Sequence, residues 1–370
     1  MTSPSHYMRI ALDAAEGVRG STSPNPWVGA VVVRDGVVVA TGATETPGGR
    51  HAEAVALDQA GDAAQGADMF VTLEPCTPFP GKRTPSCAVR LVAAGVARVH
   101  VALADPDPNV SGRGIQHLRG AGIEVIVSDG AGHARTSLRP YLKHRETARP
   151  YVIARWASSL DGRTATATGE SRWITGPAAR DRSHQERARV DAILTGSGTV
   201  LADDPALTAR PGGILSAHQP VRVIADARGR VSPTAALFSA PGHTIVATTD
   251  ASDPAWRLAI SSAGAQVILC ESGHTGLNLD QLLGILAARG IMSIWAEAGA
   301  TLLGALFDAA LVDEVWAFLA PVVIGGTAAR PSVAGNGAAL LSDAWRLREA
   351  TTELLGDDIL VRGHCGPWEP

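Results

Sequence analysis

Several kinds of segment are missing from this 370-residue chain, and each absence removes a class of protein. No apolar run reaches about 18 residues, and the first residues do not combine a charged stretch with an apolar core, so we expect neither a membrane span nor a signal peptide. No stretch is rich in Lys and Arg, and the formal net charge is −4, which argues against nucleic acid as the main partner. A small molecule is therefore the expected partner, and the cytoplasm is the expected location.

Cysteine is also scarce, with four residues in the whole chain. Two of them, Cys270 and Cys365, lie far apart in sequence, which suits a reducing compartment without a disulfide framework. Internal repeats and low-complexity segments are lacking. The chain is 45% apolar, which at this length predicts two globular domains of ordinary size. The sequence leaves a homo-oligomer open, because it does not fix the oligomeric state.

The other two cysteines belong to a pattern with a specific chemistry. His51, Cys76 after a proline, and Cys87 supply one imidazole and two thiols in the order that zinc-dependent nucleobase deaminases use. Zn²⁺ held by three such ligands keeps a fourth position for a water molecule, whose pKa it lowers. Glu53 is two residues from His51 and is not a ligand, so it can take the proton of that water and pass it to the leaving amine.

Two other interpretations of this pattern are open at this point. Cys76 and Cys87 could be small buried apolar residues, with His51 on the surface. A closed structural zinc site would instead need a fourth protein ligand. The nearest candidate is His100, which opens an apolar run typical of a strand. The order of three ligand types and a shuttle carboxylate favours the open, catalytic site.

The first part of the chain alternates patterns typical of helices and strands. Met8, Ala11, Leu12 and Ala15 recur at helical spacing, and Asp35-Gly36 is a strong hairpin signal. A further helix is expected to start near His51, and Pro85 is expected as the first residue of a helix that carries Cys87. This pattern predicts an α/β sheet with helices on both faces. The expected strands are 28–33, 37–40, 69–73, 99–103 and 124–127.

A charged stretch, 139–150, separates this part from the rest of the chain. The apolar pattern restarts at Tyr151, so we predict a first domain over 1–147 and a second over 148–370. The second domain is again of the α/β type, with a helix over 279–289. Its expected strands are 151–157, 192–195, 221–225, 244–248, 266–269, 293–296 and 314–319.

Three glycine-containing turns follow strands of the second domain. Gly196-Ser197-Gly198 lacks the third glycine of a dinucleotide fingerprint, and by itself it fits a tight turn and a phosphate contact equally well. Gly299 follows an expected strand and allows the amide groups at a helix start to approach an anion. Gly325-Gly326 follows Val322 to Ile324, which we expect to be a strand. Three such turns at the carboxyl edge of one sheet make a nucleotide crevice plausible.

For several other side chains of the second domain, the sequence allows two interpretations, one structural and one functional. Trp173 is either a core aromatic residue or, because its neighbours are polar, the wall of a site. Asp203 and Asp204 precede a proline and suit a turn. Arg187 and Arg210 are either solvated surface charges or ligands for an anion. Composition does not separate these readings.

With these residues in view, the chain resembles the family of bifunctional riboflavin-biosynthesis deaminase/reductases over nearly its full length. The matching motifs occur in order across both domains, which makes the resemblance highly specific. They are Pro24-Asn25-Pro26-x-Val28-Gly29, His51-Ala52-Glu53-Ala54, Thr72-Leu73-Glu74-Pro75-Cys76, Arg83-Thr84-Pro85-x-Cys87, Asp105-Pro106-x-Pro108-x-Val110-x-Gly112, Ser159-Leu160-Asp161-Gly162, Trp173-Ile174-Thr175, 199–205 and Glu297-Ala298-Gly299.

The resemblance implies a cytidine-deaminase-like first domain and a dihydrofolate-reductase-like second domain that uses NADPH. The implied reactions are hydrolytic deamination of 2,5-diamino-6-ribosylamino-4(3H)-pyrimidinone 5′-phosphate and reduction of the ribosyl group to ribityl. It implies zinc ligands at His51, Cys76 and Cys87 and a proton shuttle at Glu53. The implied substrate positions are Asn25, Ser171, Arg187, Leu207, Arg210 and Glu297. The implied NADPH positions are Ala157, Trp173, Thr199, Asp203, Gly299, Ala300, Thr301, Leu302, Leu303, Gly304 and Ala305.

Departures from the family pattern in two places concern specificity. The segment Thr77 to Ser86 is two residues longer than usual and lacks a histidine, and Ser86 replaces a proline. Arg155 stands where the family usually has lysine before the Ser-Leu-Asp-Gly motif, and a guanidinium is bulkier and cannot change its protonation state. These departures are the only support for a paralogue that acts on a related pyrimidine in specialised metabolism. A third reading, an idle zinc protein that serves as an interaction partner, conflicts with the shuttle carboxylate Glu53.

Overall fold

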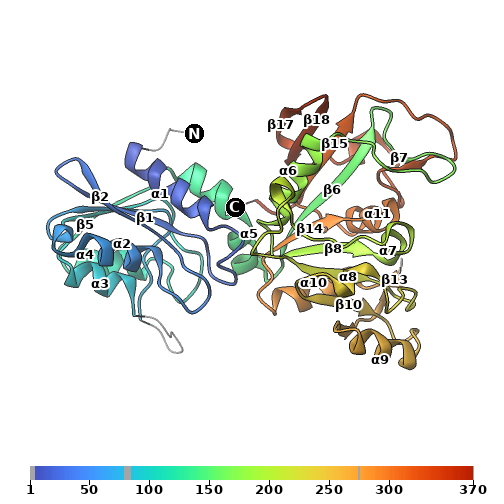
Figure 1. The fold of residues 1–370 in the computed structure, drawn as a ribbon. Helices are drawn as coiled ribbons and strands as arrows, with labels where there is room; N and C mark the ends of the chain where they lie inside the picture. Colours follow the sequence, from blue (N-terminus) through green and yellow to red (C-terminus); the bar gives the residue numbers. More distant parts are fainter. Residues whose placement is uncertain (1–4, 79–84, 274–275, 370) are drawn as a thin grey trace. The chain divides into compact units, whose positions relative to one another are not determined.

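The computed structural model describes residues 5–78, 85–273 and 276–369, and the chain forms two compact units, Met1–Ala148 and Arg149–Glu369. Each unit has its own sheet and its own helices (Figure 1). None of the helices in the described ranges has the length and apolar character needed to cross a membrane. The units divide one residue after the position at which the sequence places its domain boundary.

The first unit is built on a five-stranded mixed sheet in the order β2-β1-β3-β4-β5. The β1-β2 hairpin turns at Asp35-Gly36, where both residues have positive φ, as the sequence predicts. Strand β3 pairs antiparallel with β1, and β3, β4 and β5 are parallel. The strands are β1 (Gly29–Arg34), β2 (Val37–Ala43), β3 (Asp68–Val71), β4 (Arg98–Val101) and β5 (Glu124–Val127).

Helices cover both faces of this sheet, and two glycines allow them to approach closely. A Cβ atom added at Gly29 would lie 1.8 Å from the backbone oxygen of Ala11 in α1. A Cβ atom at Gly42 would lie 2.2 Å from the backbone oxygen of Ala52 in α2. Gly29 pairs with Ala43 across the hairpin, so Gly29 and Gly42 face opposite sides. The helices are α1 (His6–Gly17), α2 (Ala52–Ala60), α3 (Cys87–Ala93), α4 (Arg113–Gly120) and α5 (Ala131–Thr147), with the short turn η1 (Gly61–Ala64).

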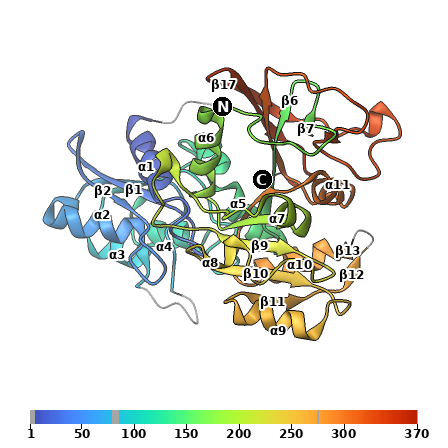
Figure 2. The same ribbon diagram turned by 45° about the vertical axis from the view of Figure 1, so that its right-hand side comes forward.

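The second unit contains a nine-stranded sheet in the order β11-β10-β9-β8-β14-β6-β15-β18-β17. The seven strands from β11 to β15 are parallel to their neighbours, and β18 and β17 add an antiparallel hairpin at one edge. Figure 2 shows β9 and β10 side by side within this sheet. The strands are β6 (Tyr151–Ser159), β8 (Ala192–Gly196), β9 (Val221–Ala225), β10 (Thr244–Thr248), β11 (Gln266–Leu269), β14 (Ser293–Glu297), β15 (Glu314–Ala320), β17 (Arg348–Leu355) and β18 (Asp358–His364).

Buried side chains form a separate core on each face of this sheet. Alternate residues of each strand face opposite sides, so Val152 and Ala154 join one core while Tyr151 and Ile153 join the other. The first core also includes leucines of α10 (Leu279–Ala287) and α11 (Ala300–Asp308). The second includes residues of α6 (Pro177–Arg187), α7 (Ser197–Asp203), α8 (Ala236–Ser239) and α9 (Pro254–Ser262). Smaller elements are β7 (Arg163–Ala165), β12 (Ser272–Gly273), β13 (Gly276–Leu277), β16 (Arg330–Pro331), η2 (Pro211–Gly213) and η3 (Leu341–Asp343).

The structure differs from the sequence-based expectation in three places. Pro85 is not helical, because Ser86 caps α3 by accepting a hydrogen bond from the amide of Val89. Val322 to Ile324 is not a strand: β15 ends at Ala320, and the amides of Ile324 and Gly325 donate to the carboxylate of Asp161 instead of pairing in the sheet. The edge strand β17 is exposed over nearly its whole length, so it carries no apolar pattern from which it could be predicted.

Candidate functional site

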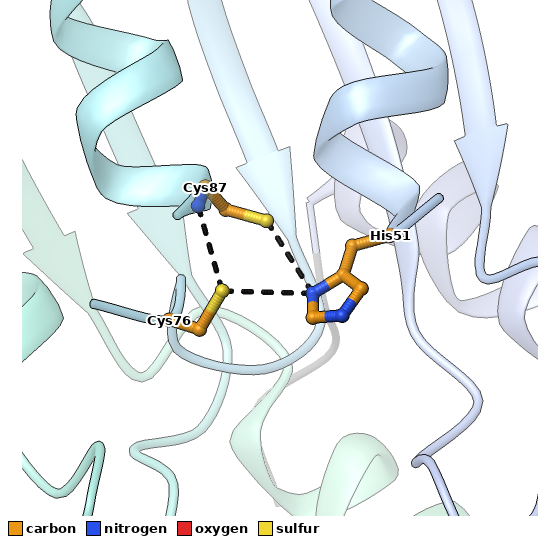
Figure 3. Close-up of side chains that lie close together, drawn as sticks. All are labelled: His51, Cys76 and Cys87. Carbon is orange, nitrogen blue, oxygen red and sulfur yellow. Dashed lines mark hydrogen bonds between the residues drawn. The ribbon is translucent and has the colours of Figure 1, made fainter. Parts of the chain in front are cut away.

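The three predicted metal ligands of the first unit meet at one point (Figure 3). The Nδ1 atom of His51 lies 3.6 Å from Sγ of Cys76 and 3.4 Å from Sγ of Cys87. His51 precedes the first residue of α2, Cys76 lies in the loop after β3, and Cys87 is the first residue of α3. This is the single group of three or more His, Cys, Asp or Glu ligand atoms that converges within the described part of the chain.

The position of Cys76 is fixed by hydrogen bonds to the start of α3. Its backbone oxygen accepts the hydroxyl of Ser86 at 2.7 Å and the amide of Ala88 at 3.1 Å. The amide of Cys87 donates to the sulfur of Cys76 at 3.4 Å. These hydrogen bonds fix the loop of Cys76 against the start of α3, so the two thiols, eleven residues apart in sequence, are held close together.

A buried carboxylate holds the loop on the other side of Cys76. Glu74 is 4% exposed and accepts the backbone amides of Asp105, Gly112, Gly114 and Ile115 at 2.9 to 3.2 Å. The last two amides belong to the first turn of α4, where the helix dipole also favours a negative charge. Glu74 thus ties β3, the loop after β4 and α4 together directly beside the ligand loop.

Glu53 lies in the first turn of α2 and is 3% exposed. Burial, followed by the negative charge of Cys76, raises the pKa of Glu53 to about 7. Its carboxyl group also shares a hydrogen bond with Cys87, so it lies beside the ligand cluster. One helix start therefore supplies a ligand and a buried carboxyl group on the same side of the site.

The two thiols influence each other's acidity. The hydrogen bond from Cys87, which outweighs the effect of burial, together with the bond to His51 lowers the pKa of Cys76 well below its usual value. The pKa of Cys87 is raised well above its usual value because this thiol donates to Cys76 and is buried. A buried thiolate with a thiol and an imidazole around it is an arrangement that suits a soft divalent cation.

Asn25 lies at the same edge of the first sheet as the ligands. It belongs to the loop before β1, and its backbone amide donates to the backbone carbonyl oxygen of Thr22 at 2.9 Å. Because β1 and β3 are antiparallel, the start of β1 adjoins the end of β3, and Gly29 exchanges hydrogen bonds with Thr72. Asn25 and Cys76 each lie four residues from this junction.

The second unit contains a cavity of about 1530 Å³ along the carboxyl ends of its parallel strands. Most of the cofactor and substrate positions predicted in this unit line it. The loops that form it adjoin closely: a Cβ atom added at Gly299 would lie 3.7 Å from the hydroxyl of Thr199, and one at Gly196 would lie 3.6 Å from Leu302. The predicted residues that line it are Ala157, Ser171, Trp173, Arg187, Thr199, Asp203, Leu207, Arg210, Glu297, Gly299, Ala300, Thr301, Leu302 and Ala305.

Two residues of the predicted NADPH run face away from this cavity. Leu303 is fully buried in the core that includes α10 and α11. Gly304 packs against the backbone of Ala334, where an added Cβ atom would lie 2.3 Å from the carbonyl oxygen. The helical period explains the division, because consecutive residues of α11 point in different directions.

An ion-pair cluster lies in the wall of the cavity where β6, β14 and α6 meet. Arg187 donates from Nε and Nη2 to both oxygens of Glu297 at 2.8 to 3.0 Å, and Arg155 donates to the same carboxylate at 3.1 Å. Arg155 also donates to the hydroxyl of Ser183, and its guanidinium lies 5.0 Å from the ring centroid of Phe318. The larger guanidinium at position 155 is therefore accommodated in this chain.

The cluster fixes the charge of Glu297. Burial would raise the pKa of this carboxyl group, but Arg187 and Arg155 outweigh burial and lower the pKa to about 2. His184, beside Arg187, is neutral at pH 7, because burial and then the charges of Arg187 and Arg210 lower its pKa to about 4. Glu297 is thus an anion at all ordinary pH values, held between two cations.

We expect Glu297→Gln to lower the free energy of unfolding of the second unit by about 3 kcal/mol at pH 7, because two half-buried cations lose their counter-ion. The pKa of Glu297 lies below the ordinary value of 4.5, so its contribution is present above about pH 5 and is lost as pH falls toward 2. Hydrogen exchange at β6 and β14 measures this effect. Glu271→Gln, an exposed site in the same unit, is the control. An equal stability loss at pH 3 and pH 7 would contradict the charge argument.

The structure also decides the open readings of the sequence. Trp173 is 72% exposed and lies on the cavity wall, where the guanidinium of Arg180 is 4.5 Å from its ring centroid. Arg187 is fully engaged in the cluster, whereas Arg210 is exposed at the cavity rim. Asp203 is the last residue of α7 and is paired with Arg172, and the chain turns at Asp204, which has a positive φ. Of the two arginines, Arg210 has the guanidinium better placed for an incoming anion.

Sequence inspection did not single out Arg180, Ser183, His184, Arg228 or Arg230, all of which line the cavity. Three of these lie on α6, at i, i+3 and i+4 from Arg180, with Arg187 one further turn along. This spacing places them on one face of the helix. A polar stripe at helical period, in a helix that carries Arg187, is the signal that could have found them.

Two family models match the chain. The model described as the cytidine and deoxycytidylate deaminase zinc-binding region covers residues 1–103, and the model described as the RibD C-terminal domain covers residues 150–361. The first match contains the cluster of His51 and Cys76, and the second contains the whole cavity of the second unit.

Curated relatives match over nearly their full length. Riboflavin biosynthesis protein RibD of Escherichia coli (strain K12) is 41% identical over 366 residues, which cover 96% of this chain and 98% of the relative. The Chlamydia pneumoniae protein of the same name is 39% identical over 364 residues, with 98% and 95% covered.

Solved structures agree with these matches. RibD of Acinetobacter baumannii superposes with a TM-score of 0.87 at 38% identity and covers 98% of each chain. A diaminohydroxyphosphoribosylaminopyrimidine deaminase/5-amino-6-(5-phosphoribosylamino)uracil reductase of Thermotoga maritima gives a TM-score of 0.85 at 30% identity, with 97% of each chain covered.

Proposed function

Since the chain belongs to the RibD family of riboflavin-biosynthesis deaminase/reductases, we propose that its first unit is a zinc-dependent pyrimidine deaminase and its second an NADPH-dependent reductase. The chain is an enzyme of riboflavin biosynthesis. The proposed substrate is 2,5-diamino-6-ribosylamino-4(3H)-pyrimidinone 5′-phosphate, which loses an amine by hydrolysis in the first unit. The second unit then reduces the ribosyl group to ribityl.

The observation that carries the deaminase assignment is the spacing of the three ligand atoms. Tetrahedral zinc with ligands at about 2.0 to 2.3 Å separates them by about 3.4 to 3.8 Å. The separations of His51 Nδ1 from the two sulfurs, 3.6 and 3.4 Å, fall in this range. Three protein ligands, one imidazole and two thiolates, fit a catalytic zinc ion that keeps a position open. Bound there, zinc would supply the Lewis acidity that makes hydroxide available at neutral pH.

Glu53 is the proposed proton carrier. It is buried beside the ligands and is held by the first turn of α2, so its carboxyl group has a fixed position. It would take a proton from the attacking water and deliver it to the departing amine, as general acid/base catalysis requires. Asn25, at the same edge of the sheet, would hydrogen-bond the pyrimidine. The segment 79–84, which belongs to the longer loop after Cys76 and includes Arg83-Thr84, lies outside the described residues.

The second unit provides a cavity with a fixed anion on its wall. NADPH would supply the two electrons of the reduction. We assign Ala157, Trp173, Thr199, Asp203 and the cavity-facing residues of Gly299 to Ala305 to its binding. Leu303 and Gly304 would hold α11 in position, because Leu303 packs in the core and Gly304 packs against the backbone of Ala334. The substrate would contact Ser171, Leu207, Arg210 and Glu297, and Arg187 would hold Glu297 in place. An anionic Glu297 can stabilise positive charge that develops on the ribosyl nitrogen and carbon when the sugar ring opens.

Arg210 is the proposed ligand of the substrate phosphate, because its guanidinium lies at the cavity rim and suits bidentate capture of a phosphate. Arg210→Ala should lower kcat/KM of reduction by the equivalent of about 1.5 to 3 kcal/mol. For a substrate that lacks the 5′-phosphate, Arg210→Ala should lower kcat/KM of reduction only slightly. The rate of deamination should not change with either substrate. The measurement is kcat/KM for both substrates with parent and variant, as a double cycle. Equal penalties for the two substrates would make Arg210 an ordinary surface charge.

The whole assignment is tested by incubating zinc-loaded protein with the diaminopyrimidine phosphate, with and without NADPH, followed by mass analysis. Exchange of an amine for a carbonyl raises the nominal mass by one, and the reduction adds two hydrogens. A deaminated product without NADPH and a deaminated, reduced product with NADPH are expected. Turnover of a different pyrimidine alone would instead identify a paralogue with altered specificity.

A further inference from the structure

Two arginines of the second unit line the cavity at a distance from the Glu297 cluster. Arg228 and Arg230 belong to the loop between β9 and α8, at the carboxyl end of β9. In the sheet order, β9 is separated from β14 by β8, while Arg155 and Glu297 of the ion-pair cluster lie on β6 and β14. Neighbouring strands are about 4.8 Å apart, so the two strand ends are separated by roughly 10 Å.

The loop holds Arg230 in a defined position. Its backbone amide donates to Oδ2 of Asp226 at 2.6 Å, and the amide of Val231 donates to the same oxygen at 2.8 Å. Its guanidinium donates to the hydroxyl of Ser197 at 2.7 Å, in the turn after β8. The side chain of Arg230 remains 54% exposed, and Arg228 is exposed beside it. Two positive charges are therefore presented to the cavity from a braced loop.

The direction in which a dinucleotide lies in the cavity follows from the chemistry of the proposed function, on which this inference rests. The nicotinamide must reach a substrate held near Glu297, so it would lie at the ends of β6 and β14. The start of α11, a nine-residue helix that begins after Gly299, would then face the pyrophosphate. The adenosine half would extend past the turn after β8 to the loop after β9, where Arg230 lies.

At the adenosine ribose, dinucleotide sites distinguish two cofactors. A carboxylate that accepts the ribose 2′-hydroxyl favours NADH, whereas an arginine at that place accommodates the 2′-phosphate of NADPH. The carboxylates of Asp226 and Asp204 both bind groups of the protein. Asp226 is fully buried, its Oδ2 accepts two backbone amides of its own loop, and its Oδ1 lies 4.0 Å from Nε of Arg230, a long ion pair. Asp204 accepts the amide of Ala236 at the start of α8.

We propose that Arg228 and Arg230 bind the 2′-phosphate of NADPH and determine the preference of this enzyme for NADPH over NADH. Ser197 supports Arg230 and supplies a further hydroxyl to the same phosphate. Because a phosphate dianion is matched by two guanidinium groups, the discrimination comes from charge-assisted hydrogen bonds that NADH cannot form.

The experiment is calorimetric titration of the full-length protein, which measures binding without turnover. The probes are two matched pairs, NADPH with NADH and adenosine 2′,5′-bisphosphate with 5′-AMP. The variants are Arg230→Ala, Arg228→Ala, the double variant and Arg230→Lys, which keeps the charge but not the planar fork. Arg346→Ala, an exposed arginine of the same unit that does not line the cavity, is the control. Melting temperatures verify that each variant is folded.

The double variant should bind NADPH and adenosine 2′,5′-bisphosphate about 10- to 100-fold more weakly, the scale for hydrogen bonds to charged groups. NADH and 5′-AMP should bind as in the parent, and Arg230→Lys should give an intermediate loss. The proposal is overturned if both members of each pair weaken equally, or if the double variant keeps the parent's preference for NADPH and adenosine 2′,5′-bisphosphate. In either case the assignment of NADPH stands. A parent that binds neither dinucleotide overturns both this inference and the proposed cofactor.

Discussion

A Glu53→Gln variant is expected to keep its zinc and to lose deamination by at least about two orders of magnitude, the usual scale for removal of a general acid/base. Glutamine has nearly the shape of glutamate but cannot carry a proton between water and amine. The carboxyl group is 3% exposed, so bulk water does not replace it easily. Reduction of the deaminated intermediate should continue, because Glu53 and the cavity of the second unit belong to separate compact units.

The measurement is kcat/KM of deamination together with the zinc content of the same preparation. Glu124→Gln on β5, where the side chain is 64% exposed, is the matched control and should behave as the parent. Full deaminase activity in a zinc-replete Glu53→Gln protein would remove this residue from the mechanism. Loss of zinc from the variant would show that Glu53 supports the ligand cluster rather than the proton transfer.

A Cys76→Ala variant should lose zinc and deamination together while reduction continues. The remaining ligands, His51 and Cys87, leave too few bonds to retain the ion. Within the described residues of the second unit, no group of three His, Cys, Asp or Glu ligand atoms converges, so NADPH oxidation on the deaminated intermediate should not depend on metal. Chelation of the parent protein should have the same effect as the substitution.

Cys270→Ala is the control, because this thiol is also buried but lies outside the ligand cluster. It should change neither zinc content nor either activity by more than a small factor. Metal analysis and the two rates, measured on the same sample, test the prediction. If NADPH oxidation stopped on zinc removal in a protein that is still folded, the division of the two chemistries between the units would be wrong.

Much of the architecture was predictable because buried strands of a parallel sheet are continuous apolar runs. The predicted strands 221–225, 244–248 and 266–269 coincide with β9, β10 and β11. The edge strand β17 was not predictable, since both of its faces are exposed and its residues are largely polar. The opposite error occurred at Val322 to Ile324, an apolar run predicted as a strand. Val322 and Val323 are exposed instead of buried in the sheet, and the amides of Ile324 and Gly325 donate to Asp161.

The sequence by itself determined the chemical class of the first unit and the family of the chain, because ligand type, order and spacing are local properties of His51, Glu53, Cys76 and Cys87. The sequence did not determine which charged side chains form ion pairs. Arg187 pairs with Glu297, a residue 110 positions away. Because of this pair, Arg187 does not present an unpaired positive charge to the cavity.

Tertiary structure also decided which residues of a matched segment reach the site. Leu303 and Gly304 turn into the core because α11 has a helical period, although they belong to the same run as Gly299. Arg230 and Ser197 meet because β8 and β9 are neighbours in the sheet, an order that no local pattern encodes. Strand neighbours are set by the burial of the whole sheet between two layers of helices, so contacts across the sheet become known only when the chain is folded.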